Sequence, residues 1–109
     1  MMNTKEISLC SSLEEVRENI DQIDDALISL IAQRNYYVNQ AAHFKTSIEN
    51  TVAQDRVNEV IQKVRSLAKM NGLNPNLTEK IYRTMIKGFT EQELAIVNPT
   101  YRDIKNSYY

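Results

Sequence analysis

The sequence predicts an all-α protein, and three observations support this fold class. The 109 residues include only two glycines and two prolines, the residues that most often interrupt a helix. Apolar side chains recur at steps of three and four residues, the spacing of one helix face. The length corresponds to one domain. We expect a helical domain over residues 12–97, between a flexible leader (1–11) and a C-terminal tail (98–109).

The first predicted helix is very long and runs from Leu13 to Phe44 or Lys45. Ser11 or Ser12 is a suitable N-cap residue. One face carries an apolar seam: Leu13, Val16, Ile20, Ile23, Leu27, Leu30, Val38 and Ala41. Such a helix is roughly 48 Å long, whereas a domain of this size has a radius of gyration of about 13 Å. The first helix would therefore extend beyond the rest of its own domain. We expect a second copy of the chain to cover the extending part, as in a homodimer.

A polar connector, residues 46–54, separates this helix from a second one predicted between Asp55 and Met70. The Asn-Gly pair at 71–72 is typical of a helix end, because glycine accepts the left-handed backbone that closes a helix. The apolar stripe of the second helix consists of Val57, Val60, Ile61, Val64, Leu67 and Ala68. This spacing predicts one buried face.

A third helix is predicted after the Asn-Pro pair at 74–75, which supplies an N-cap and a proline in the first turn. A second Asn-Pro pair, at 98–99, ends it. Its apolar residues are Leu77, Ile81, Met85, Ile86, Phe89 and Ile96. The sequence therefore predicts a chain of three helices.

Composition excludes several classes of function. The net charge of −1 gives no overall electrostatic attraction to nucleic acid or anionic membranes. Cys10 and His43 are the only residues of their kinds, which argues against a disulfide and against cysteine- or histidine-rich metal sites. No run approaches the roughly 18 apolar residues of a membrane span. We expect a cytoplasmic protein without metal or cofactor.

Arg34 occupies a position where the apolar seam predicts a leucine. Lys45 lies eleven residues further on, and about 100° per residue brings it to within roughly 20° of Arg34. Because a buried charge is costly unless something pairs with it, an acidic side chain or an anionic ligand should meet these cations. The structural alternative is an ion pair of Arg34 with Asp24 or Glu93.

Arg17 precedes Arg34 by 17 residues and lies about 42 Å from Lys45 on a straight helix. No small ligand spans that distance. If both residues serve one site, they come from different chains, as an antiparallel pairing of the long helices would allow. The alternative for Arg17 and Lys45 is that each is an ordinary solvated cation.

The other helices add further candidates. Arg56 opens the second helix, where the alternative is a surface ion pair with Asp55 or Glu59. Gln92 and Glu93 interrupt the apolar stripe of the third helix, and a buried polar side chain there needs a partner. Nothing resembles a Ser/His/Asp or Cys/His nucleophile, a phosphate loop or a carboxylate pair. An enzyme with this sequence would perform chemistry that needs no nucleophile.

Together these features identify a family resemblance. The segments LEEVRENIDQIDDALISLIAQR, YYVNQAAHFK, DRVNEVI, NGLNP and IYRTMIKGF, within residues 12–97, resemble the all-helical (type II) chorismate mutases. The resemblance implies an intertwined homodimer of three-helix chains without a cofactor. It also implies conversion of chorismate, a dicarboxylate, to prephenate, a step of aromatic amino acid biosynthesis in the shikimate pathway.

The resemblance also implies roles for particular residues. Arg17 matches the arginine that the partner subunit contributes, and Arg34 matches the arginine that grips a substrate carboxylate. Lys45 matches the lysine that bonds the breaking ether oxygen, and Arg56 matches an arginine near the site. Glu93 falls where the family commonly has glutamine and some members have glutamate.

Two departures from the pattern leave the reaction open. Val57 stands where the mutases usually have a glutamate that contacts the substrate's ring hydroxyl, and valine is found there in the related isochorismate pyruvate lyases. That branch makes salicylate and pyruvate but keeps glutamine at the position of Glu93. Gln92, about 100° away around the helix, is the alternative to Glu93 as the residue that plays the part of the family's glutamine. A non-catalytic helical dimer with a regulatory or interaction role is the third hypothesis.

Overall fold

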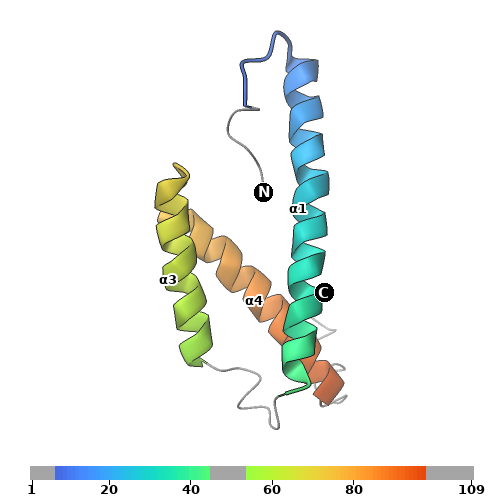
Figure 1. The fold of residues 1–109 in the computed structure, drawn as a ribbon, viewed down its shortest axis with the longest axis vertical. Helices are drawn as coiled ribbons and strands as arrows, with labels where there is room; N and C mark the ends of the chain where they lie inside the picture. The colour runs from blue at the N-terminus through green and yellow to red at the C-terminus, as the bar shows by residue number, and fades with distance from the viewer. Residues whose placement is uncertain (1–6, 45–53, 98–109) are drawn as a thin grey trace. The chain divides into compact units, whose positions relative to one another are not determined.

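The computed structural model describes residues 7–44 and 54–97 of the chain. These residues contain three helices and no strand, so the predicted all-α class is confirmed. The chain divides into two units, residues 1–37 and 38–109. The helices are α1 (Leu13–Ala42), α3 (Gln54–Met70) and α4 (Pro75–Val97), shown in Figure 1. None of these helices combines the length and hydropathy that crossing a lipid bilayer demands.

Ser12 is the N-cap of α1. Its Oγ accepts a hydrogen bond of 3.1 Å from the backbone N–H of Glu15. The Glu15 carboxylate in turn accepts hydrogen bonds from the hydroxyl and the backbone N–H of Ser11, at 2.9 and 3.3 Å. These bonds satisfy amide donors that the first turn of a helix leaves without intrahelical partners. The predicted capping by this serine pair is confirmed, with Ser12 as the cap.

The predicted end of the first helix, at Phe44 or Lys45, was too late. The helix ends at Ala42 because the backbone tightens there. The N–H of His43 donates to the carbonyl of Gln40 at 3.1 Å, and that of Phe44 donates to the carbonyl of Ala41 at 3.0 Å. These bonds span three residues instead of four, as at many helix ends. Lys45 and most of the connector 46–54 lie outside the described residues.

α1 is one unbroken helix of 30 residues, about 45 Å long. None of its residues is buried. The apolar seam is therefore open to solvent, and Leu27 near its middle is 50% exposed. The same holds for Leu13, Val16, Ile20, Ile23 and Leu30. A single chain thus leaves a long apolar helix face uncovered, which is unusual for a stable monomer.

α3 begins one residue earlier than predicted and ends at Met70, as predicted. Gly72 has a φ of +73°, the left-handed conformation that closes many helices. The N–H of Leu73 donates to the carbonyl of Ala68 at 2.8 Å, and that of Gly72 donates to the carbonyl of Lys69 at 3.3 Å. The predicted helix stop is therefore confirmed as a Schellman motif.

Asn74 is the N-cap of α4, again as predicted. Its Oδ1 accepts a hydrogen bond of 2.9 Å from the N–H of Asn76, and its carbonyl accepts one of 3.0 Å from the N–H of Thr78. Pro75 occupies the first helical position, where its missing N–H costs no hydrogen bond. A four-residue connection, residues 71–74, and strong caps therefore fold α3 and α4 into a hairpin.

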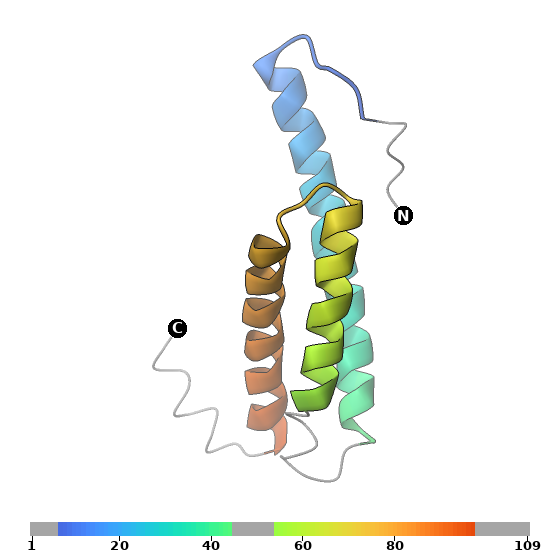
Figure 2. The same cartoon turned by 90° about the vertical axis from the view of Figure 1, so that its left-hand side faces the viewer.

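The two helices of the hairpin pack against each other and diverge with distance from the turn that joins them (Figures 1 and 2). Ile61 is 2% exposed and is the most deeply buried large side chain among those described. Part of the predicted apolar stripe lies outside this core, because Leu67, Leu77 and Ile81 are exposed. The buried apolar residues are Ile61, Val64, Ala68, Leu94 and Ala95. The hairpin thus has a small core and leaves apolar side chains exposed near its turn.

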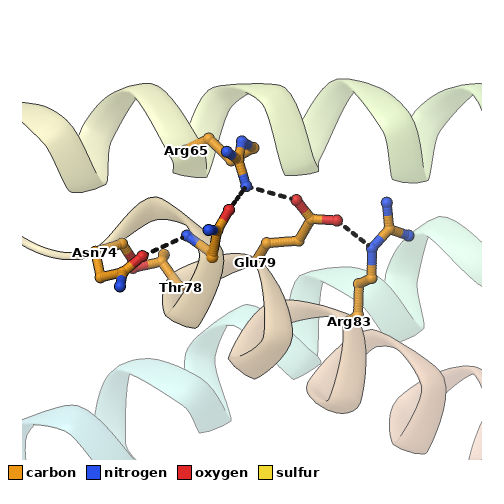
Figure 3. A network of polar contacts seen from close by, with 6 residues as sticks. Arg65, Asn74, Thr78, Glu79 and Arg83 are labelled. Atoms are coloured by element: carbon orange, nitrogen blue, oxygen red, sulfur yellow. Dashed lines mark hydrogen bonds and ion pairs between the residues drawn. The ribbon is translucent and has the colours of Figure 1, made fainter.

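A polar network also ties α3 to α4 (Figure 3). One oxygen of the Glu79 carboxylate lies 2.8 Å from a guanidinium nitrogen of Arg65 on α3, and the other lies 2.7 Å from Nε of Arg83 on α4. Arg65 also donates to Asn76 at 3.1 Å. The hydrogen bond from Arg83 is the main cause that lowers the pKa of Glu79. Burial opposes this effect, and the Arg65 hydrogen bond adds to it.

Candidate functional site

Two arginines of α1 were predicted to belong to the site. Arg34 is half-buried, and Arg17 is exposed. Both lie on the same unbroken helix, about 25 Å apart along its axis. They cannot contact one small ligand from a single chain. The predicted alternative of an Asp24–Arg34 ion pair is also excluded within one chain, because ten residues of helix separate them by about 15 Å.

Lys45, predicted to share the face of Arg34, lies outside the described residues. Its proposed contact with an ether oxygen stays a prediction. Beyond Arg34 on the predicted seam, Val38 is half-buried and Ala41 is exposed.

Arg56 and Val57 lie in the first turn of α3. Arg56 donates to Glu59 at 3.0 Å, and their side chains are 72% and 69% exposed. This is the surface ion pair that the sequence suggested as an alternative. An exposed pair of this kind holds its partners weakly, so the guanidinium remains available to a ligand. Val57 is half-buried.

Gln92 and Glu93 lie near the end of α4, and their environments differ. Glu93 is 3% exposed and is the buried charged residue among those described, whereas Gln92 is exposed. The helix register thus turns Glu93 toward the interior. Of the two residues proposed for one role, Glu93 is the one directed inward.

The hairpin brings the candidates of α3 and α4 to one end. Because α4 returns beside α3, the first turn of α3 and the last turns of α4 both lie away from the Asn-Gly turn, where Figure 1 shows the two helices diverging. Arg56 and Val57 therefore share an end of the hairpin with Glu93. The residues toward that end are thus an exposed cation and a half-buried apolar side chain on α3 and a buried carboxyl group on α4.

Arg65, Glu79 and Arg83 were not predicted from the sequence. The spacing of Glu79 and Arg83, four residues apart on one helix, was a readable signal for their ion pair. The contact from Arg65 was not readable, because it depends on how two helices are rotated against each other. In the described part of the chain, no cluster of three potential metal ligands occurs.

Comparison with known proteins places these features in a family. The model of the family described as chorismate mutase type II matches residues 16–94. Isochorismate pyruvate lyase of Pseudomonas aeruginosa is 28% identical over 85 residues, which cover 78% of this chain and 84% of the relative. Chorismate mutase of Methanocaldococcus jannaschii is 28% identical over 80 residues, which cover 72% of this chain and 81% of the relative.

The matched segment contains Arg17, Arg34, Arg56 and Glu93, together with all of α3. It begins in the first turn of α1 and ends close to the end of α4. The resemblance inferred from sequence motifs is therefore confirmed over most of the chain. This chain belongs to the chorismate mutase type II family.

Proposed function

We propose that this protein is a chorismate mutase that rearranges chorismate to prephenate as a homodimer. The observation that carries the proposal is Arg34, a half-buried cation on the apolar face of a helix in a chain of this family. A dicarboxylate substrate carries negative charge with which such a cation can pair. The relative from Methanocaldococcus jannaschii, named chorismate mutase, supports the same reaction.

The chemistry fits a site without a nucleophile. The rearrangement is unimolecular, so the protein has to hold a compact conformer and stabilise negative charge on the ether oxygen as the C–O bond breaks. Fixed cations serve both purposes without an acid, a base or a cofactor. In this proposal Arg34 grips one carboxylate and Lys45 donates to the ether oxygen. One donor to a developing oxyanion is worth about 3–4 kcal/mol.

The second chain is needed for two reasons. The seam of α1 is exposed in the single chain, and a partner's α1 would cover it. Arg17 lies too far along the helix to join Arg34 from the same chain, so it would enter the partner's site. Antiparallel pairing of the two long helices brings the start of one helix toward the end of the other.

Glu93 and the hairpin end complete the proposed site. Glu93, directed inward on α4, lies where the family commonly has glutamine, and a protonated carboxyl can donate a hydrogen bond as the amide does. Gln92 would contact substrate only at the edge of the site. Arg56 would exchange its exposed pair with Glu59 for a substrate carboxylate.

Isochorismate pyruvate lyase is the second candidate, favoured by Val57. This residue replaces the glutamate usual in the mutases, and the relative from Pseudomonas aeruginosa carries the lyase name. The lyase reaction also has a pericyclic course and would use the same cations. A non-catalytic helical dimer remains as the third hypothesis.

One assay separates the three functions. The pure protein is incubated with chorismate and with isochorismate, and prephenate, salicylate and pyruvate are measured. Prephenate from chorismate, with little salicylate from isochorismate, is the expected result. If salicylate predominates, the protein is an isochorismate pyruvate lyase and not a mutase. If a folded dimer turns over neither substrate, both enzymatic functions are rejected.

The matched control is Arg34→Ala. This variant should lose turnover and keep its helical circular dichroism and its sedimentation as a dimer. If it unfolds instead, Arg34 is a structural residue and the observation that carries the proposal is lost. Tyr36→Ala, an exposed side chain two residues away, should retain activity.

A further inference from the structure

The hairpin of α3 and α4 has two unlike faces. Arg65 and Glu79, 2.8 Å apart, mark a polar face (Figure 3). Leu67 is two residues from Arg65 on α3. Leu77 and Ile81 are each two residues from Glu79 on α4. Two residues turn a helix by about 200°, so these three apolar side chains point away from the polar face. They are 44%, 56% and 56% exposed and form what we call the apolar hairpin face.

The first half of α1, residues 13–25, is a second uncovered apolar surface. Its seam residues are 38–61% exposed, namely Leu13, Val16, Ile20 and Ile23. The hairpin of the same chain is too short to cover all of α1, because α4, its longer helix, is about 34 Å long and α1 is about 45 Å long. In a pair of chains, each exposed surface can be covered by its counterpart on the other chain.

The two surfaces carry opposite charge. Residues 13–25 include six aspartates and glutamates and one arginine. Residues 63–87 of the hairpin include six lysines and arginines and one glutamate. Lys63, one turn from Leu67, borders the apolar hairpin face on α3, and Lys80 borders it on α4; both are exposed. An acidic helix with an apolar seam therefore matches a basic hairpin with an apolar face, although the net charge of the whole chain is only −1.

The order of the elements makes this contact reachable between two chains. Only residues 43–53 separate the end of α1 from the start of α3. In an antiparallel pair of α1 helices, the start of one helix lies toward the end of the other, and the partner's hairpin follows that end. The first half of α1 is therefore directed to the side of the pair where the partner's hairpin is attached.

We infer that the acidic first half of α1 docks through its seam on the apolar hairpin face of a second copy, and that opposite charge selects this pairing. The inference rests on the homodimer of the proposed function. Apolar contact supplies affinity without direction, whereas complementary charge suppresses the wrong pairings of hairpin with hairpin and of acidic helix with acidic helix. A basic surface alone would also suit a nucleic acid, but the matching acidic seam in the same chain favours a second copy.

The sign of the salt dependence separates charge-guided docking from apolar contact alone. Salt screens the attraction of opposite charges, so the dimer dissociation constant, measured by sedimentation, should rise about tenfold between about 0.05 M and about 0.5 M NaCl. The double variant Lys63→Glu/Lys80→Glu brings like charges together, so its weakened dimer should tighten over the same range. A dissociation constant that ignores salt, or that moves in the same direction in both proteins, would overturn the inference.

An exchange of charge between two chains is the sharper test. Lys63→Glu/Lys80→Glu reverses the hairpin, and Asp21→Lys/Asp24→Lys reverses the first half of α1. Each double variant alone should form a homodimer at least about tenfold weaker, because like charges meet in both contacts. In a mixture, one contact pairs the two reversed surfaces and the other pairs two unmodified surfaces. The mixed dimer should therefore regain the dissociation constant of the unmodified protein to within about threefold.

The control is Lys69→Glu, an exposed position on the polar face four residues from Arg65. It should leave the dissociation constant within about twofold of that of the unmodified protein. Circular dichroism checks that each variant stays helical. A mixture of the two reversed variants that shows no preference for the mixed dimer would overturn the inference, whether or not the protein turns over chorismate. Preferred mixed dimers of a protein that turns over neither substrate would support the docking and reject the proposed function.

Discussion

Glu93 is buried, and its neighbour Gln92 is exposed. The two side chains point about 100° apart on α4, and only Glu93 is turned inward. A carboxyl group therefore occupies the inward position at the end of the hairpin where Arg56 and Val57 also lie. If that end binds chorismate, the protonation state of Glu93 affects the reaction.

Activity is predicted to rise toward mildly acidic pH. An ionised carboxylate beside the ether oxygen would repel the negative charge that develops there, whereas a protonated one can donate a hydrogen bond. Glu93→Gln should raise kcat/KM at neutral pH by at least about tenfold, because a full donor to such an oxygen is worth up to about 10²–10³ in rate. It should also flatten the pH–rate profile.

The measurement is kcat/KM for chorismate between about pH 5 and 8. Glu18→Gln, which neutralises an exposed carboxylate of α1, is the control and should leave the profile unchanged. Identical profiles for Glu93→Gln and the unmodified protein would show that Glu93 does not face the ether oxygen.

Val57→Glu is predicted to shift the substrate preference toward chorismate. The new carboxylate would accept a hydrogen bond from the ring hydroxyl, as the resemblance to the mutases implies. The ratio of chorismate to isochorismate turnover should rise about tenfold, the value of one charge-assisted hydrogen bond. Val57→Leu, which adds no acceptor, should leave that ratio unchanged. A ratio that moves equally in both variants would assign the effect to side-chain size.

Gly72→Ala is predicted to destabilise the protein by about 1–2 kcal/mol, because the φ of +73° brings Cβ too close to the following carbonyl oxygen. The control is Gly88→Ala inside α4, where an added Cβ meets no atom within 4 Å. That change should stabilise the helix by about 0.5–1 kcal/mol. Urea unfolding measures both variants. A loss of stability in Gly88→Ala as large as in Gly72→Ala would contradict the assignment of the strain to the turn.

The hairpin is predicted to lose stability in acid through Glu79. Its pKa is lowered, chiefly by the hydrogen bond from Arg83, so the folded state binds this proton less readily than the unfolded chain does. The stability that the ionised Glu79 carboxylate contributes is present at pH values above its ordinary pKa of 4.5. It disappears as the pH falls through the lowered pKa of the folded state. Thermal unfolding between about pH 2 and 7 should show this loss, and Glu79→Gln should reduce it. Glu59→Gln, in an exposed pair, should change the curve less. Equal curves for the two variants would argue against the network as the cause.

The helices were predictable from sequence because their signals are local. Ser12, Gly72 and Asn74 set helix ends through their own backbone and side-chain bonds. The inward direction of Glu93 followed from the helical period. The end of α1 was less predictable, because the last turn tightens after Ala42 without a glycine or proline to mark it.

The site was harder to predict for a physical reason. The pair of Arg65 with Glu79 depends on the rotation of α3 against α4, which apolar spacing does not specify to within one side chain. A meeting of Arg17 with Arg34, as proposed, would depend on a second chain. Sequence periodicity could show only that one chain cannot bring them together.

A subunit-mixing experiment tests whether the site is shared between chains. Arg17→Ala and Arg34→Ala should each be inactive as homodimers, because every site lacks one arginine. After both variants are unfolded together and refolded, a mixed dimer has one site with both arginines and one site with neither. Random pairing makes half of the dimers mixed, so activity should return to about a quarter of that of the unmodified protein.

The control is each variant refolded alone, which should stay inactive at the same concentration. Recovery of about a quarter of the activity in the mixture is the predicted result, and it would place Arg17 and Arg34 of different chains in one chorismate site. A mixture that forms mixed dimers by mass spectrometry and remains inactive would contradict that shared site.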